Sequence, residues 1–141
     1  DLNSIHAVGD ASLGLAGSTR YVFTIDTPSN KDFVAEWRKE YATEPDVFEG
    51  EQYQACQILQ AGVEAAQSID AEKLRPALEK VAIDSIKGHV AMRECDHQAV
   101  QGGYMVKVER PAGAKAPLPQ IIATFPGDAI TPACRQMTFD S

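Results

Sequence analysis

Apolar residues recur at every third or fourth position through the middle of the chain, a spacing that places them on one face of a helix. The first such segment follows Ser29 or Asn30, either of which can cap a helix. It ends before Pro45, because the residue that precedes a proline avoids helical geometry. Its predicted inward face consists of Phe33, Val34, Trp37 and Tyr41. The pattern therefore predicts an amphipathic helix in this part of the chain.

A longer helix is predicted from Asp46 to about Gln67. Asp46 and Glu49 have the spacing of a capping box, in which two side chains satisfy backbone N–H groups that the first turn leaves free. The predicted inward stripe consists of Tyr53, Cys56, Leu59, Val63 and Ala66. Cys56 is therefore expected to be a buried small hydrophobic residue.

Two shorter helices are predicted on either side of these. Asp70 caps the later one, whose inward residues are Leu74, Leu78 and Val81. Pro76 either lies near its first turn or kinks it, because proline disrupts a helix interior. The earlier one lies within residues 1–17, where small residues dominate, and is expected to stop near Gly9 or Gly14.

Strands are predicted where β-branched and aromatic residues gather or alternate with polar ones. One such run, residues 19–25, precedes the helices. Three more, residues 89–93, 104–109 and 120–125, follow them, and a proline-rich loop over residues 111–119 separates the last two. The order is strand, three helices, then three strands, so the predicted class is α/β. Because strands and helices do not alternate in the second half, this chain alone is not expected to form a complete doubly wound sheet.

Composition narrows the function classes without changing this picture. The chain has 141 residues, 44% hydrophobic and 23% charged, which is ordinary for one globular domain. Its formal net charge of -7 disfavours nucleic acid as a partner, because phosphate binding needs clustered cations. No apolar run approaches the ~20 residues of a membrane span. The chain begins at Asp1 rather than Met, which is typical of a processed or truncated product.

Candidate chemistry concentrates around two cysteines in polar, turn-like segments, Cys95 and Cys134. Together with His89 and His97 they suggest zinc, but a structural zinc site needs four ligands in paired short spacings, so no metal site is predicted. In an oxidising compartment a Cys95–Cys134 disulfide is favoured instead. Cys95 and His97 could also be a nucleophile and its base, yet nothing supplies an oxyanion hole or a pocket. No enzymatic activity and no cofactor are predicted.

Seven segments, taken in order, resemble the closing portion of bacterial periplasmic solute-binding proteins of the leucine/isoleucine/valine type. They are Arg20-Tyr-Val, Asp26-Thr-Pro-Ser-Asn-Lys-Asp-Phe-Val, Trp37-Arg-Lys-Glu-Tyr, Asp46-Val-Phe-Glu-Gly-Glu-Gln-Tyr-Gln-Ala, Leu74-Arg-Pro-Ala-Leu-Glu, Gly88-His-Val-Ala-Met-Arg and Tyr104-Met-Val-Lys-Val-Glu. Members of this family are two-lobed receptors that deliver small molecules to an ABC importer. Their chain crosses between the lobes three times, and the ligand lies in the cleft.

The resemblance implies the C-terminal part of a type I periplasmic-binding-protein fold, incomplete as a two-lobed receptor. Residues 1–28 and 101–141 would belong to the second lobe, and residues 29–100 to the first. The front half would be missing, so the chain would be a fragment or would cover its exposed edges by oligomerisation. Phe48 and Tyr21 would contact the ligand in the cleft.

The function implied is that of an extracytoplasmic, periplasmic component of an ABC importer. It would bind an amino acid or a related small carboxylate or amide, and its partner would be a membrane permease. One alternative is a cytoplasmic ligand-sensing domain of the same fold, for which free thiols rather than a Cys95–Cys134 bridge are expected. A second, from a different class, is a small metal-binding or Cys-His enzyme domain.

Overall fold

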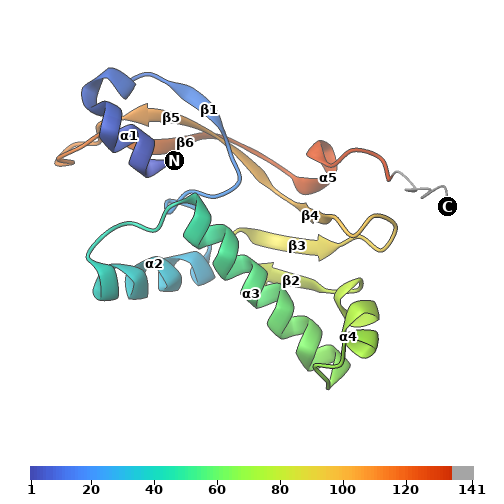
Figure 1. Ribbon diagram of the computed structural model, residues 1–141. Helices are drawn as coiled ribbons and strands as arrows, with labels where there is room; N and C mark the ends of the chain where they lie inside the picture. The colour runs from blue at the N-terminus through green and yellow to red at the C-terminus, as the bar shows by residue number, and fades with distance from the viewer. Residues whose placement is uncertain (135–141) are drawn as a thin grey trace.

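The computed structural model of the protein describes residues 1–134, and within them the strands form two antiparallel sheets (Figure 1). Sheet A has the strand order β1-β5-β6, with β1 at Ala16–Thr19, β5 at Gly103–Glu109 and β6 at Leu118–Phe125. Sheet B has the order β2-β3-β4, with β2 at Ala82–Ser85, β3 at Gly88–Met92 and β4 at Ala99–Gln101. The α/β class is confirmed, and β2 and β4, together with all of β1 except Thr19, are additions to the predicted strands.

The helices are divided between the two sheets. A helix α1 (Leu2–Val8) and a 3-10 helix η1 (Gly9–Ser12) accompany sheet A. Gly9, the first of the two predicted stopping points, is the C-cap of α1. Helices α2 (Pro28–Tyr41), α3 (Val47–Ala66) and α4 (Ala71–Leu78) accompany sheet B, and a short α5 (Gly127–Ile130) lies beside β4. Figure 1 shows these as two halves of an elongated molecule. Among the described residues, no helix combines the length and apolarity that crossing a bilayer requires.

The strand predicted over residues 19–25 is wrong. Only Thr19 belongs to a strand, and residues 20–27 form an irregular connection, called here the first crossover, that leads from sheet A to α2. Carbonyl groups in this segment accept hydrogen bonds from the Asn30 side chain and not from a neighbouring strand. Its apolar residues are nevertheless buried. The β-branched and aromatic residues here therefore indicated a buried segment and not an extended strand.

Helix α2 confirms the predicted segment but not its cap. Thr27 is the N-cap, and its Oγ1 accepts a hydrogen bond from the backbone N–H of Asn30 at 3.1 Å. Pro28 follows at the first helical position, where its missing N–H costs nothing. In α4, Pro76 lies inside the helix, past the first turn.

Helix α3 has the predicted capping box, because the Glu49 carboxylate accepts from the Asp46 N–H at 2.9 Å and the Asp46 carboxylate accepts in return. Its inward face differs from the prediction. The buried positions of α3 are Gly50, Gln54 and Gly62. The expected stripe lies largely outward, and its exposed members, called here the outer face of α3, are Tyr53, Cys56 and Leu59. One side of the Tyr53 ring still packs on Phe33 of α2, with the ring centroids 4.3 Å apart. The expectation that Cys56 is buried is therefore wrong.

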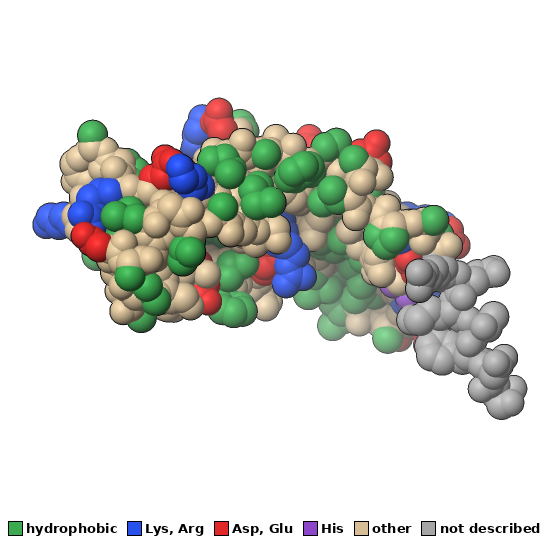
Figure 2. All heavy atoms as spheres, turned by 90° about the horizontal axis from the view of Figure 1, so that it is seen from above, with side chains coloured by type: hydrophobic (Ala, Val, Ile, Leu, Met, Phe, Trp, Pro, Cys, Tyr) green, Lys and Arg blue, Asp and Glu red, His purple; other side chains and the backbone are tan. Residues whose placement is uncertain are grey.

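The main core lies where the two halves meet. It is called here the junction core, and its buried residues are Leu2, Tyr21, Val22, Phe23, Ile25, Phe33, Val34, Ile86 and Tyr104. They come from α1, the first crossover, α2, the β2–β3 turn and β5, so elements of both sheets share one apolar interior. By contrast, the surface seen from the end that carries sheet A shows hydrophobic side chains scattered among charged ones (Figure 2). The junction core therefore connects the two sheets through one shared apolar interior.

Candidate ligand groove at the junction of the two halves

Asn30 organises the first crossover, the segment that forms one side of the junction. Its Nδ2 donates to the carbonyl oxygens of Phe23 and Ile25 at 3.0 and 2.9 Å, and its Oδ1 accepts from the Tyr21 hydroxyl at 2.9 Å. Asn30 itself is 1% exposed. One buried amide thus replaces the ladder hydrogen bonds that a strand would have provided, which is required because buried backbone groups need partners.

Gly50 allows α3 to approach this crossover closely. A Cβ atom built at Gly50 would lie 2.3 Å from two ring atoms of Tyr21, a distance that real Cβ atoms do not show. Tyr21 is 2% exposed, and burial is the main reason why its pKa is raised well above the ordinary value of 10.0, with smaller contributions from the negative charges of Glu44 and Glu49. The start of α3 is therefore positioned directly against the crossover.

A buried ion pair lies on the other side of the junction. The Lys87 side chain, in the β2–β3 turn, is fully buried, and its Nζ lies 2.5 Å from Glu51 Oε1 of α3. Burial lowers the pKa of Lys87 below its usual value, Glu51 raises it in part, and the nearby positive charge of Arg20 lowers it further. The Lys87 carbonyl accepts from the Tyr104 hydroxyl of β5 at 3.0 Å. Sheet B is thereby joined to sheet A through this turn.

An open groove of about 620 Å³ runs along the junction. The end of β1, the first residue of α3, the start of β5 and helix α5 line it, so both halves contribute. Its apolar surface comes from Val47, Tyr104, Phe125 and Ile130. Among the described residues that line the groove, the exposed Arg20 is the one basic residue and Asp1 is the one acidic residue. The groove can therefore hold a small molecule with an apolar body and a negatively charged end.

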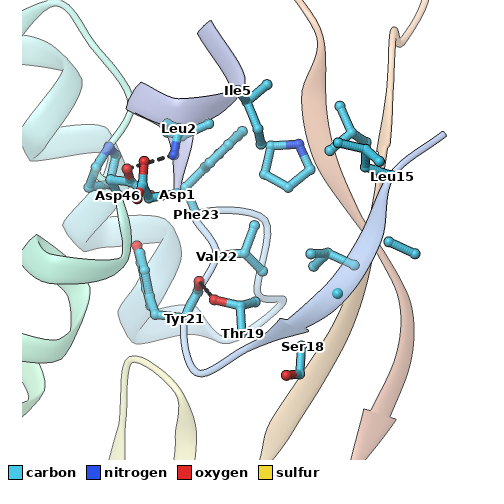
Figure 3. Close-up of a pocket in the computed structure, with 16 residues that line it drawn as sticks. Asp1, Leu2, Ile5, Leu15, Ser18, Thr19, Tyr21, Val22, Phe23 and Asp46 are labelled. Atoms are coloured by element: carbon cyan, nitrogen blue, oxygen red, sulfur yellow. Dashed lines mark hydrogen bonds between the residues drawn. The ribbon is translucent and has the colours of Figure 1, made fainter. Parts of the chain in front are cut away.

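A second, smaller cavity of about 250 Å³ lies under α1 (Figure 3). Its walls are mostly apolar, and Figure 3 shows Leu2, Ile5 and Phe23 around it. Its charged lining groups are the carboxylates of Asp1 and Asp46, and Asp46 Oδ2 already accepts from the Leu2 N–H at 2.6 Å. This cavity has two carboxylates and no basic side chain in its lining, whereas the groove has Asp1 together with Arg20. The groove is therefore the better match for an anionic ligand.

The two residues predicted to contact ligand have different surroundings. Phe48 is 72% exposed and follows Val47, a residue of the groove wall, in the first turn of α3. Tyr21 is buried, lines the cavity under α1, and donates its hydroxyl proton to Asn30. A ligand contact of Phe48 stays a prediction, and the observations do not favour one for Tyr21.

The disulfide between Cys95 and Cys134 is present, with the two Cα atoms 6.3 Å apart. The two histidines considered as zinc ligands instead lie beside carboxylates, His97 at 3.1 Å from Glu79 and His89 at 3.1 Å from Asp84. Because the Cys95 sulfur is bonded to Cys134, it is not a thiol that His97 could activate.

Three residues of the junction were not predicted as site residues from the sequence, namely Arg20, Asn30 and Lys87. Asn30 gave a partial signal, because it was one of two predicted helix caps, but its long-range partners depend on the tertiary structure. Arg20 precedes an apolar run, and Lys87 follows Ile86 in a turn, both ordinary places for a solvated cation. Only the fold shows that the Lys87 amine is buried and that Arg20 borders a groove.

Comparison with known proteins identifies related chains. A family model described as "Periplasmic binding protein" matches residues 1–115. No curated protein sequence matches the chain. Among solved structures, an ABC-type branched-chain amino acid transporter from Rhodopseudomonas palustris is 26% identical with a TM-score of 0.80, over 94% of this chain and 35% of that one.

Two further structures are similar. A solute-binding protein of an ABC transporter from R. palustris, in complex with benzoate, is 25% identical with a TM-score of 0.77, over 94% of this chain and 35% of that one. The leucine-, isoleucine-, valine-, threonine- and alanine-binding protein from Brucella ovis shares the fold, with 21% identity and a TM-score of 0.77 over 95% of this chain and 37% of that one. The chain thus spans little more than a third of the length of the solved proteins that it resembles.

Proposed function

Because the chain belongs to the periplasmic binding protein family, we propose that it is the C-terminal part of the solute-binding component of an ABC importer. The component would work outside the cytoplasm, bind its solute without chemical change, and deliver it to a membrane permease. The observation that supports this most is the groove, because both halves line it and Arg20 borders it. Similar solved chains carry ABC-transporter descriptions, which supports the same assignment.

We further propose that the two sheets belong to different lobes. Residues 1–28 and 101–141 would form part of the second lobe, around sheet A, and residues 29–100 part of the first lobe, around sheet B. The structure is compatible with this division, because the chain leaves sheet A through the first crossover and returns to it at Gly102, between β4 and β5. Hinge closure about these two connections would then enclose a ligand in the groove.

The proposed ligand is an amino acid or a related small carboxylate or amide, with a carboxylate preferred. Arg20 would accept the carboxylate through charge-assisted hydrogen bonds, and the apolar lining would contact the body of the ligand. Phe48 would add an aromatic contact from the first turn of α3. The benzoate complex of the R. palustris protein supports an aromatic carboxylate as one member of this class.

The remaining length of such a receptor would cover surface that this chain leaves open. We propose that the missing N-terminal portion of the same protein covers the outer face of α3, where Leu59 is 48% and Tyr53 42% exposed. In its absence, self-association of the fragment is the expected alternative, because exposed apolar surface favours association.

The alternative of a cytoplasmic sensor with the same fold is disfavoured by one observation. Cys95 and Cys134 form a disulfide, and such bonds persist mainly in oxidising compartments. The enzyme alternative has less support, since the thiol it requires is consumed in that bond.

Isothermal titration calorimetry on the full-length protein tests the proposed function. The ligand panel would contain branched-chain amino acids, benzoate and 4-hydroxybenzoate, each with its neutral amide as a partner. For any carboxylate that binds, Arg20→Gln should raise Kd by roughly 10- to 100-fold, because a charge-assisted hydrogen bond contributes about 1.5–3 kcal/mol.

Arg110→Gln is the matched control, because Arg110 follows β5 at the end opposite the groove and pairs with Asp10. Its Kd should equal that of the unmodified protein. Equal Kd values for the Arg20 and Arg110 variants would contradict the role of Arg20, and no binding anywhere in the panel would contradict the ligand class.

A further inference from the structure

The end of the chain returns from sheet A to sheet B alongside the second connection between the two halves. In sheet A, Phe125 at the end of β6 is paired with Gly103 at the start of β5. The chain then turns into α5, which packs on β4 of sheet B. Figure 1 shows α5 and the following segment beside the point where β4 continues into β5.

Close packing holds this segment against the connection itself. A Cβ atom built at Gly127 would lie 2.6 to 2.9 Å from backbone atoms of Gln101, and one built at Gly103 would lie 2.8 Å from the Ile130 side chain. The segment therefore touches the residues on both sides of Gly102. Glycines at two of these positions permit an approach that a side chain would block.

The segment is then fastened to the β3–β4 turn of sheet B at two points. Arg93 donates from Nη1 to the carbonyl oxygen of Pro132 at 2.8 Å, while its Nε donates to Asp96 Oδ1 at 2.9 Å. Cys95 follows Arg93 by two positions, Cys134 follows Pro132 by two positions, and these cysteines form the disulfide. A polar anchor and a covalent one thus attach the tail of the sheet A half to the sheet B half.

We propose that residues 126–134 are a covalent strap across the β4–β5 connection that limits how far the two halves can open. The inference rests on the proposed hinge function, because a strap has this effect only where the halves move. The disulfide joins residues that are 39 positions apart in the sequence, and the ring that it closes contains Gly102 and residues 126–134. Rotation about Gly102 must therefore also lengthen or bend residues 126–134.

The strap would affect ligand affinity by changing the fraction of the receptor that is near its closed, binding-competent geometry. A receptor that opens widely spends little time near the closed geometry, so its apparent affinity is reduced by that fraction. A strap that removes the most open arrangements raises the competent fraction before any ligand arrives. Ile130 of this strap lines the groove, so closing the groove would bend the strap without stretching it.

Amide hydrogen exchange on the full-length, ligand-free protein tests the strap. In the double variant Cys95→Ser/Cys134→Ser, the amides of residues 101–104 should exchange at least about tenfold faster, while those in the centre of the β5–β6 pairing keep their rates. Cys56→Ser is the matched control, because Cys56 is an exposed free cysteine on α3, and should change neither.

A second variant keeps the disulfide and slackens the strap, by insertion of two glycines between Thr131 and Pro132. It should accelerate exchange at residues 101–104 as the double variant does, even if loss of the disulfide unfolds the protein. Faster exchange confined to residues 93–98 and 131–134 in the insertion variant would overturn the proposal. The disulfide would then stabilise only the segments that it joins. Because no ligand is used, this result is independent of calorimetry, where failure of the unmodified protein to bind would count against the function alone.

Discussion

The junction core and the outer face of α3 are both rich in apolar residues, yet only the first is buried. In the junction core, Tyr21 is 2% and Ile86 0% exposed, and both belong to one buried cluster to which both halves contribute. On the outer face of α3, Leu59 and Tyr53 are nearly half exposed. The difference shows where this chain supplies its own packing partners and where it does not.

The comparison also explains the composition of α3. Its buried side uses glycines and amides, since Gly50 and Gly62 admit neighbouring side chains and Gln54 Nε2 donates to Ser85 Oγ at 2.9 Å. Gln57 receives the Ile86 N–H on its Oε1 at 3.1 Å. The more apolar residues are on the opposite side, which is the arrangement expected of a helix packed between two layers.

Breaking the junction core should have the largest effect. Gly50→Ala places a Cβ atom 2.3 Å from the Tyr21 ring, whose hydroxyl is held by Asn30, and overpacking of this kind costs about 3 kcal/mol or more. Urea unfolding of the full-length protein measures the change.

Gly62→Ala is the matched control on the same helix. Its new Cβ atom would lie 2.4 Å from Leu78 Cδ2 and 2.9 Å from Leu78 Cγ, in a half-buried side chain that can change its rotamer, and alanine favours the helix by up to about 1 kcal/mol. Its effect should stay within about 1 kcal/mol, and similar losses for both variants would show that the crossover is not the rigid element described.

A change on the outer face of α3 should have an intermediate effect. Leu59→Ser in the full-length protein should cost about 2 kcal/mol, because the missing N-terminal portion would bury this side chain. Ile69→Ser, at an 86% exposed position beyond the end of α3, should change stability by no more than about 0.5 kcal/mol. A Leu59 variant as neutral as the Ile69 variant would mean that this face is open to solvent in the whole protein.

Raising the pH above about 10 should reduce the free energy of unfolding gradually, through the tyrosines of the junction core. The pKa of Tyr21 is raised in the folded protein, mainly by burial, so the unfolded chain releases this proton first. Its contribution is complete below a pH of about 10 and is lost as pH rises further, by up to about 1.4 kcal/mol per pH unit. Burial raises the pKa of Tyr104 as well, which adds in the same direction.

Unfolding free energies measured between about pH 9 and 11 check this sign. Tyr21→Phe should reduce the alkaline slope, and Tyr41→Phe, at a ring that is 57% exposed, should leave it unchanged. A slope that is identical in the two variants would place the loss of stability elsewhere.

The sequence predicted the features that depend on neighbouring residues. The Asp46–Glu49 capping box spans four residues, and its geometry needs nothing beyond the first turn of α3. Helix α2 likewise followed from the spacing of Phe33, Val34, Trp37 and Tyr41. Phe33 and Val34 are buried as predicted, whereas Tyr41 is 57% exposed and was wrongly placed on the inward face. The resemblance to periplasmic solute-binding proteins supplied the family, which the match over residues 1–115 shows.

The predictions that were wrong, or that could not be made, concern features that depend on distant parts of the chain. Residues 19–25 have the composition of a strand, but the amide of Asn30 occupies their carbonyl groups, and no local pattern reveals that. The stripe on α3 was read inward because burial was assumed to lie within this chain. Arg20 could not be placed at a groove before the two sheets were known.

The structure of the full-length protein in complex with a bound carboxylate is the most direct test of the central claim. The account predicts that the ligand lies in the groove between sheets A and B, with its carboxylate within hydrogen-bond distance of the Arg20 guanidinium. A ligand bound in the cavity under α1, or at a surface that only one half forms, would contradict it.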